Sequence, residues 1–136
     1  RAFIPEIMGM FQKEVAQRLC APHGSKTYGI TSVLTQAFYS TELLFTLPPN
    51  AFNPPPKVDS AVVRFVRRPQ TYHADLPLHA FKSVVKMAFN QRRKTLKNAL
   101  SGLPLAQQSI PPPLLSLRAE QISVPQYTDA ARAMNR

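Results

Sequence analysis

Three consecutive prolines, Pro54–Pro56, precede a run of β-branched and aromatic residues that extends from Val58 to Val66. Proline fixes the backbone dihedral φ and has no amide hydrogen, so this tripeptide cannot lie inside a helix or a paired strand. The run that follows is typical of a buried strand. The sequence therefore predicts a stiff, extended loop that leads into a strand. Phe52, just before the prolines, is a side chain that such a loop would hold in a defined position.

The composition is that of a folded protein of one domain's length. The chain has 136 residues, of which 44% are hydrophobic and 18% charged, which is enough apolar material for a core. No apolar run approaches the roughly 18 residues of a membrane span, and no signal peptide is visible. The single cysteine, Cys20, excludes an internal disulfide and favours a reducing compartment, and its apolar neighbours predict a buried structural thiol. We therefore expect a soluble, cytoplasmic protein without a membrane partner.

Apolar periodicity divides the chain into an α/β part and a helical part. In residues 1–68 we predict helices that begin at Lys13 and near Gly29, the second reaching Tyr39, and strands over residues 7–11, 43–47 and 58–66. Residues 69–76 read as a linker. Residues 77–136 predict an all-helical unit with helices near 80–89, 92–100, 114–117 and 124–134, with Gly102 as a C-cap and Ser123 as an N-cap. Three strands and two helices do not cover both faces of a sheet, so the first part is predicted to be truncated.

The charge of the chain indicates a polyanionic partner. The sequence has 17 Lys and Arg against 7 Asp and Glu, a formal net charge of +10. Cations concentrate in the predicted helix over residues 92–100, whose apolar side would comprise Leu96, Ala99, Leu100 and Leu103. Outward-facing cations on this helix predict contacts with RNA or DNA phosphates by Arg92, Arg93, Lys94 and Lys97. The alternative is a solvated basic helix without a partner. An anionic membrane surface fits less well, because it requires large apolar residues opposite the cations.

Phe52 and Lys57 flank the prolines and suggest a second contact with nucleic acid. An aromatic ring on a stiff loop beside a cation is suited to stacking on a base while the cation holds a phosphate. The competing interpretation is that Phe52 fills the end of the sheet as a core residue.

Other chemistry finds no support in the sequence. His23, His73 and His79 stand apart from one another and from the Asp59–Ser60 pair, which argues against a hydrolase. No metal-ligand spacing is present. The four glycines, Gly9, Gly24, Gly29 and Gly102, form neither a G-x-G nor a Walker pattern, so we expect neither a metal nor a bound nucleotide cofactor in this chain.

The segment Phe52–Ser60 resembles the F-x-P-x-P-x-V-x-S motif of the ribosomal RNA adenine N6,N6-dimethyltransferases, the KsgA-type enzymes. Further segments are similar to that family and extend the resemblance over nearly the whole chain: residues 11–19, 25–33, 89–96 and 118–123. The resemblance implies an S-adenosylmethionine-dependent enzyme that dimethylates N6 of two adjacent adenosines near the 3′ end of small-subunit (16S) rRNA during ribosome biogenesis. The macrolide-resistance enzymes share the Phe-Pro motif, but residues 90–96 favour the small-subunit type.

The resemblance also implies a division of labour within a longer parent protein. The chain would be its C-terminal half: the last part of a Rossmann-like methyltransferase domain, followed by a helical RNA-binding domain. In such enzymes the residue at Phe52 lines the pocket for the flipped adenine. The glycine-rich cofactor loop, the acidic ribose ligand and the Asn-Leu-Pro-Tyr motif are missing from this sequence. The chain alone is therefore expected to be inactive and to bind no cofactor, with rRNA or the pre-30S particle as partner and self-association through an incomplete sheet. A stand-alone RNA-binding or ribosome-associated module without catalysis is the rival interpretation.

Overall fold

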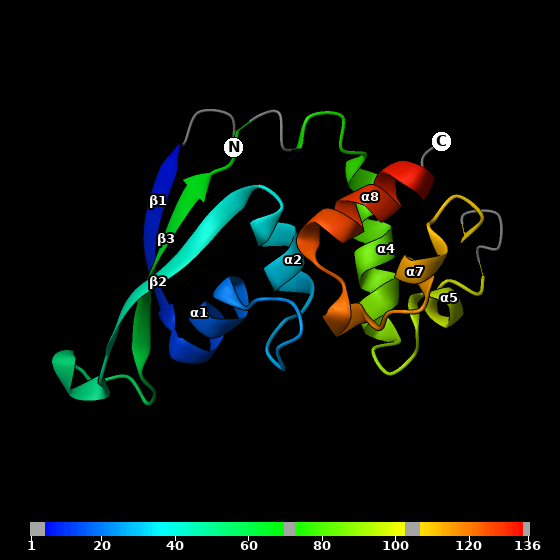
Figure 1. Ribbon diagram of the computed structural model, residues 1–136. Coiled ribbons are helices and arrows are strands. Elements are labelled where there is room, and N and C mark those ends of the chain that lie inside the picture. Colours follow the sequence, from blue (N-terminus) through cyan, green and yellow to red (C-terminus); the bar gives the residue numbers. More distant parts are fainter. Residues whose placement is uncertain (1–4, 70–72, 103–106, 135–136) are drawn as a thin grey trace.

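A three-stranded antiparallel sheet forms one side of the molecule, and helices form the other (Figure 1). The computed structural model describes residues 5–69, 73–102 and 107–134. The elements of the α/β part are β1 (Glu6–Gln12), α1 (Lys13–Cys20), α2 (Ile30–Gln36), β2 (Tyr39–Leu47), η1 (Pro49–Ala51) and β3 (Ser60–Arg67). They are followed by α4 (Leu78–Asn90), α5 (Leu96–Ala99), α7 (Pro112–Leu115), η2 (Ala119–Gln121) and α8 (Val124–Met134).

Strand β3 is the centre of the sheet, between β1 and β2. Its alternate residues Ala61, Val63 and Phe65 point to one face, where they are buried against α1. On the opposite face, the Arg64 guanidinium donates a 2.7 Å hydrogen bond to the Glu6 carboxylate of β1, which lowers the pKa of that carboxyl. Strands are confirmed in all three predicted places, but β3 begins at Ser60, so Val58 lies in the preceding loop. The predicted helix that reaches Tyr39 is too long: α2 ends at Gln36, and Tyr39 is the first residue of β2.

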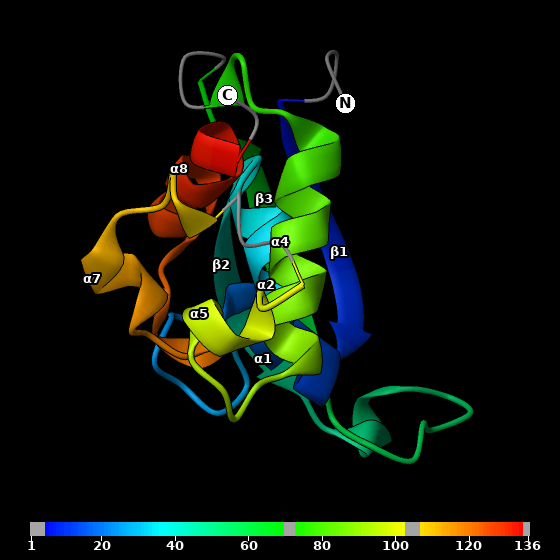
Figure 2. The same ribbon diagram turned by 90° about the vertical axis from the view of Figure 1, so that its right-hand side faces the viewer.

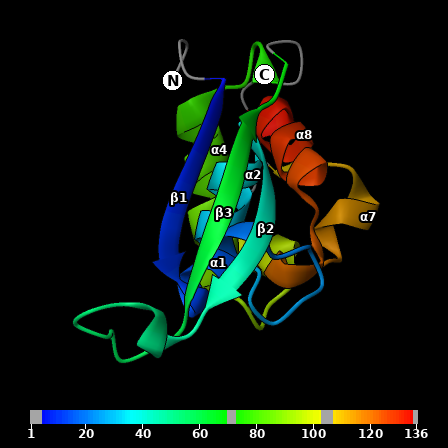
Figure 3. The same ribbon diagram turned by 90° about the vertical axis from the view of Figure 1, so that its left-hand side faces the viewer.

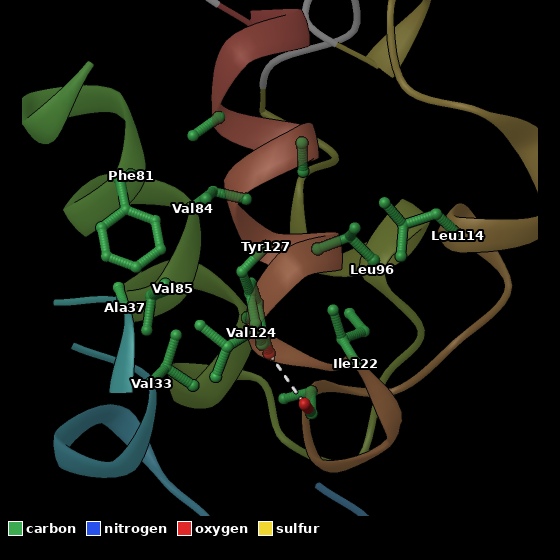
Figure 4. Packing of buried hydrophobic residues seen from close by; sticks show 14 of the residues in the cluster. Val33, Ala37, Phe81, Val84, Val85, Leu96, Leu114, Ile122, Val124 and Tyr127 are labelled. Carbon is green, nitrogen blue, oxygen red and sulfur yellow. Dashed lines mark hydrogen bonds between the residues drawn. The ribbon is translucent and has the colours of Figure 1, made fainter. Parts of the chain in front are cut away.

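The larger core lies between α2, α4 and α8. Figure 4 shows Val33 of α2 and Ala37 at its C-cap beside Phe81, Val84 and Val85 of α4, with Val124 and Tyr127 of α8 in the same cluster. The Tyr28 hydroxyl donates to the Ile122 carbonyl at 2.7 Å, and the Tyr127 hydroxyl donates to the Ala119 carbonyl at 2.8 Å. Burial raises the pKa of the Tyr127 phenol, so the donor stays protonated. These bonds satisfy two buried hydroxyls inside an otherwise apolar cluster.

Helix α2 connects the two parts of the chain. It belongs by sequence to the α/β part, and the Gln36 side-chain amide donates to the Leu19 and Ala21 carbonyls, each at 2.9 Å. Its apolar face nevertheless packs against α4 and α8. One hydrophobic cluster therefore crosses the predicted boundary at residues 69–76, of which 70–72 lie outside the described residues. The division into two domains stays a prediction.

The predicted basic helix over residues 92–100 is wrong. Helix α4 ends at Asn90, residues 91–94 form a turn closed by a 2.8 Å hydrogen bond from the Lys94 amide to the Gln91 carbonyl, and α5 begins only at Leu96. The Leu96 amide donates to the Leu117 carbonyl at 2.7 Å, which takes the backbone out of a helical path. The buried side formed by Leu96, Ala99 and Leu100 is confirmed, whereas Leu103 lies outside the described residues.

Two predicted helix ends have different outcomes. Gly102 is not a C-cap, because α5 already ends at Ala99 with Leu100 as its cap. Ser123 is confirmed before α8: its hydroxyl accepts from the Gln126 amide at 3.3 Å, and the Gln126 side chain accepts from the Ser123 amide at 2.9 Å. None of the helices in the described ranges has the length and apolarity that crossing a bilayer requires.

Candidate nucleic-acid interface

The loop between β2 and β3 projects beyond the end of the sheet and carries Phe52 (Figure 2). Its first turn is η1, where the Phe52 amide donates to the Pro49 carbonyl at 3.3 Å. The three prolines follow outside any helix or strand, and the Asn53–Pro54 peptide bond is cis. The loop returns to β3 beside α1, because the Asp59 carbonyl accepts from the Lys13 amide at 2.9 Å. The loop thus has a hydrogen-bonded turn of its own before Phe52 and is attached to α1 at its other end.

Phe52 is half-buried and belongs to neither cluster of buried hydrophobic residues. Residues 53–59 are exposed, including Lys57, which makes no ion pair among the described residues. The ring is therefore outside both cores, which the interpretation of Phe52 as a core residue does not explain.

Arg92 has partners within the protein. Its guanidinium donates to the Lys26 carbonyl at 3.1 Å, lies 3.4 Å from the Glu120 carboxylate, and sits 5.7 Å from the centre of the Phe89 ring. These contacts join the turn after α4 to the loop before α2 and to η2. The Arg92 side chain is 38% exposed, but these contacts already engage it within the protein, where it anchors the turn. Its predicted contact with an RNA phosphate stays a prediction.

Arg93, Lys94 and Lys97 are exposed and make no ion pair with any described carboxylate. Four of the seven acidic residues are occupied by other arginines, in the pairs Glu14–Arg18, Glu6–Arg64, Glu120–Arg92 and Asp129–Arg132. The three cations are carried by a turn and the short α5 rather than by one helix, so they are displayed at a corner of the molecule. Their charge is available to an external anion.

The loop with Phe52 and the turn with Arg93 lie at the same end of the molecule. In all three ribbon views, which share a vertical axis, both segments are at the lower end, and α1 lies between them (Figures 1, 2 and 3). The two predicted groups of site residues, 40 positions apart in sequence (Phe52 and Arg92, 92 − 52), thus lie at one end of the fold. In Figure 1 they are at opposite sides of that end, the loop beyond the sheet and the turn below α4.

Two residues that hold the site together are not indicated by the local pattern of apolar and charged residues. Lys26 contributes a backbone carbonyl and Glu120 a carboxylate to Arg92, from 66 and 28 positions away. Both lie in segments that resemble the dimethyltransferase family, and that resemblance was the one hint that they matter.

The remaining titratable residues show no catalytic arrangement. His73 is buried at 5% exposure and lies with its ring centre 5.0 Å from that of Phe38, as expected of a packing residue. Cys20 is partly buried, and burial raises the pKa of its thiol, which disfavours a nucleophilic role. Within the part of the chain that the structure describes, no three His, Cys, Asp or Glu side chains gather where they could hold a metal ion.

Comparison with known proteins identifies relatives of the chain. The ribosomal RNA small subunit methyltransferase A of Cytophaga hutchinsonii is 50% identical over 135 residues, which are 99% of this chain and 52% of that protein. The protein of the same name from Flavobacterium johnsoniae is 52% identical over 124 residues, 91% of this chain and 47% of the relative. The chain thus spans about half the length of the curated relatives it matches.

Solved structures share the fold. A dimethyladenosine transferase from Plasmodium falciparum superimposes with a TM-score of 0.81 at 18% identity, over 96% of this chain and 57% of that one. The 23S rRNA methyltransferase ErmE gives a TM-score of 0.66 at 18% identity, over 98% of this chain and 56% of its own. Residues 1–112 match the sequence profile of the family described as ribosomal RNA adenine dimethylase. This match covers most of the chain, and the chain therefore belongs to the ribosomal RNA adenine dimethylase family.

Proposed function

We propose that the chain is the C-terminal part of an S-adenosylmethionine-dependent rRNA methyltransferase. The parent enzyme dimethylates N6 of two adjacent adenosines near the 3′ end of small-subunit rRNA, on the pre-30S particle in the cytoplasm. The observation that carries this proposal is the family match over residues 1–112, which includes the complete motif at Phe52–Ser60. The names of the half-length matches support the small-subunit assignment.

The incomplete sheet supports the assignment to the C-terminal part. Strand β1 is at the edge of the sheet, and Figure 3 shows no helix in front of the outer face. On that face Met8, Met10 and Phe45 are 62%, 54% and 51% exposed. A sheet face with this many apolar side chains is normally buried against other elements. In this proposal, a segment of the parent enzyme outside this chain covers the face.

In this proposal Phe52 and the cations have separate tasks. Phe52 stacks on the target adenine after it has left the base stack, and so orients N6 for methyl transfer. Lys57, Arg93, Lys94 and Lys97 contact phosphates, which position the RNA without reading its sequence. Arg92 keeps the turn in place.

The residues present do not fit S-adenosylmethionine. Such a cofactor needs a glycine-rich strand-to-helix junction and an acidic partner for its ribose. Here β1 runs into α1 through Gln12 and Lys13, without a glycine. Gly29, before α2, follows a loop rather than a strand. The cofactor of the parent is therefore assigned to the part of the enzyme outside this chain, and the chain alone is proposed to be inactive.

RNA binding tests the proposal on the chain itself. A fluorescent hairpin with the 3′-terminal small-subunit sequence should bind with an affinity that falls steeply with salt. Arg93→Ala and Lys97→Ala should each lower the slope of log K against log[salt] by about one unit, equally for unrelated hairpins. Binding no tighter than that of an uncharged control protein of similar size would overturn the proposed interface.

The rival proposal, an RNA-binding module without catalysis, predicts the same RNA binding. It is favoured by the lack of a cofactor cradle among the described residues. The intact mass of the natural protein separates the two, because the enzyme requires a chain about twice as long as this one, as in the relatives.

A further inference from the structure

We call residues 48–59, between β2 and β3, the Phe52 loop, and residues 91–94, which include Arg93 and Lys94, the basic turn. Three hollows lie between these two segments. The first, of about 370 Å³, is lined by Val58 and Asp59 at the end of the loop and by residues 12–14 and Gln17. The second, of about 390 Å³, lies between α1, residues 26–31 and the end of α4. The third, also about 390 Å³, is bounded by residues 89–94.

Shared lining residues make these hollows neighbours, and we infer that together they form one groove. Glu14 lines the first and the second hollow, and Phe89 and Arg92 line the second and the third. We call this path the groove. It begins where the Phe52 loop meets α1 and ends at the turn that carries Arg93 and Lys94.

The groove is mainly cationic. Lys13, Arg18 and Lys26 line its first two hollows, and the turn cations line the third. Its acidic residues are Asp59 and Glu14, and the latter is paired with Arg18 at 2.9 Å. The Lys26 side chain is exposed and makes no ion pair among the described residues, whereas its backbone carbonyl is held by Arg92.

Hydroxyl groups complete the wall of the second hollow. Thr27 and Thr31 line it and are exposed, so each can donate to a phosphate or ribose oxygen. Cations and hydroxyls together in one groove suit a polynucleotide backbone better than a lipid surface, which would require large apolar side chains.

We propose that the groove holds single-stranded RNA between the base at Phe52 and the phosphates at the basic turn, with Lys26 as its central phosphate contact. The proposal rests on the proposed function and deepens it, because it assigns a path to the strand that carries the target base. A base can be presented to Phe52 only from a strand that is locally unpaired, and the groove offers the next nucleotides a cationic track.

A charge-matched pair of variants tests Lys26. Lys26→Ala removes one exposed cation in the groove and leaves the carbonyl that Arg92 uses. Lys82→Ala removes one exposed cation from α4, away from the three hollows. With single-stranded RNAs of increasing length, Lys26→Ala should lower the affinity of the longer RNAs about fivefold and the salt slope by about one unit, whereas Lys82→Ala should change affinity less than about twofold.

A volume-matched pair separates a groove from general attraction. Gly29 lines the second hollow with an extended backbone (φ −154°), and a Cβ atom added there would meet no atom within 4 Å. Gly29→Gln therefore narrows the groove without changing charge, and Gly102→Gln adds the same bulk at another open position. We expect Gly29→Gln to weaken binding of the longer RNAs about fivefold and Gly102→Gln to leave it unchanged. Circular dichroism and melting temperature check that all four variants are folded.

The outcomes distinguish the groove from the proposed function. If the wild-type chain binds RNA and Arg93→Ala weakens binding, but Lys26→Ala and Gly29→Gln behave like their controls, the groove is wrong and the basic turn stands. If the wild-type chain binds no RNA, the proposed interface fails first, and the groove fails with it.

Discussion

Phe52 shows how a single aromatic side chain is presented by the loop around it. The ring lies outside both hydrophobic clusters, yet the backbone on either side is fixed by hydrogen bonds to Pro49 and, beyond the prolines, to Lys13. A side chain that contributes little to a core but is held in position is suited to contact a ligand.

We predict that Phe52→Ala in the complete enzyme lowers kcat/KM for rRNA methylation about tenfold to a hundredfold, because stacking on one base is worth about 1–3 kcal/mol. Affinity for rRNA should change less than about twofold, since the phosphate contacts remain. Phe52→Tyr, which keeps the ring, should be milder. The measurement is single-turnover methyl transfer with a parallel binding titration.

Leu78→Ala is the control for Phe52, because Leu78 is an exposed apolar residue (37%) at the start of α4 that lines none of the three hollows. It should leave methylation nearly unchanged. If Phe52→Ala instead costs about 3 kcal/mol or more of unfolding free energy, as truncation of a core phenylalanine does, the ring is a structural plug.

Exposure of the cations could be predicted from sequence, but the partner of Arg92 could not. Arg93, Lys94 and Lys97 stand among polar neighbours, and local patterning is enough to place them in solvent. The position of Arg92 is decided by Lys26 and Glu120, which are distant in the chain. No periodicity within residues 92–100 contains that information.

At the scale of elements, the turn between α4 and α5 depends on an ion pair made from a third element. Glu120 of η2 reaches Arg92, while its backbone carbonyl accepts from the Gly24 amide at 2.5 Å. Arg92 therefore holds the turn against the loop with Lys26 and against η2. This also fixes the position of the exposed cations Arg93 and Lys94 in the same turn.

We predict that Glu120→Ala weakens RNA binding by about twofold to fivefold. Removing a carboxylate raises the positive charge, so electrostatic attraction alone would strengthen binding. Loss of the ion pair with Arg92 also loosens the turn. This weakens binding, because the cations of the turn must then be ordered when RNA binds. A fluorescence titration at constant salt measures the sign of the change directly.

Asp129→Ala is the matched control, since it removes an acid that is also paired with an arginine, Arg132, but on α8. This variant should bind RNA as well as the wild type or slightly better. Equal strengthening by Glu120→Ala and Asp129→Ala would show that the geometry of the turn is irrelevant. Loss of one partly exposed ion pair should cost at most about 1 kcal/mol of stability.

Regular elements with local signals are predicted well, and those that end through distant contacts are not. Neighbouring residues are enough to predict the alternation in β3 and the helical spacing of α1 and α4. They are also enough to predict Ser123 as a capping residue. The helix over residues 92–100 fails because the Leu96 amide pairs with the Leu117 carbonyl, 21 positions away (117 − 96). Helix propensity within the segment is overridden by this backbone pairing.

At the scale of the whole molecule, the sheet is covered on one face only. Helices α1 and α2 lie on the inner face, whereas the outer face carries the three exposed apolar residues Met8, Met10 and Phe45 (Figures 1 and 3). Strand β1 hydrogen-bonds to β3 and has no second partner among the described residues. An open edge beside an apolar face is a ready template for pairing with another chain.

We predict that the 136-residue chain self-associates reversibly in the micromolar range. Sedimentation velocity over a concentration series should show the sedimentation coefficient rising with concentration. Met8→Lys should shift association to higher concentration, because a charge on the edge strand opposes both burial of the face and pairing of the edge.

Val15→Lys is the control, because Val15 is a 40% exposed apolar residue on α1 and lies off the sheet. It changes charge and size in a similar way but should not shift association. A chain that stays monomeric throughout the series, or two variants that act alike, would mean that the outer face does not attract a second copy. In the complete enzyme the same face should be occupied, so Met8→Lys there should lower the unfolding free energy rather than change the oligomeric state.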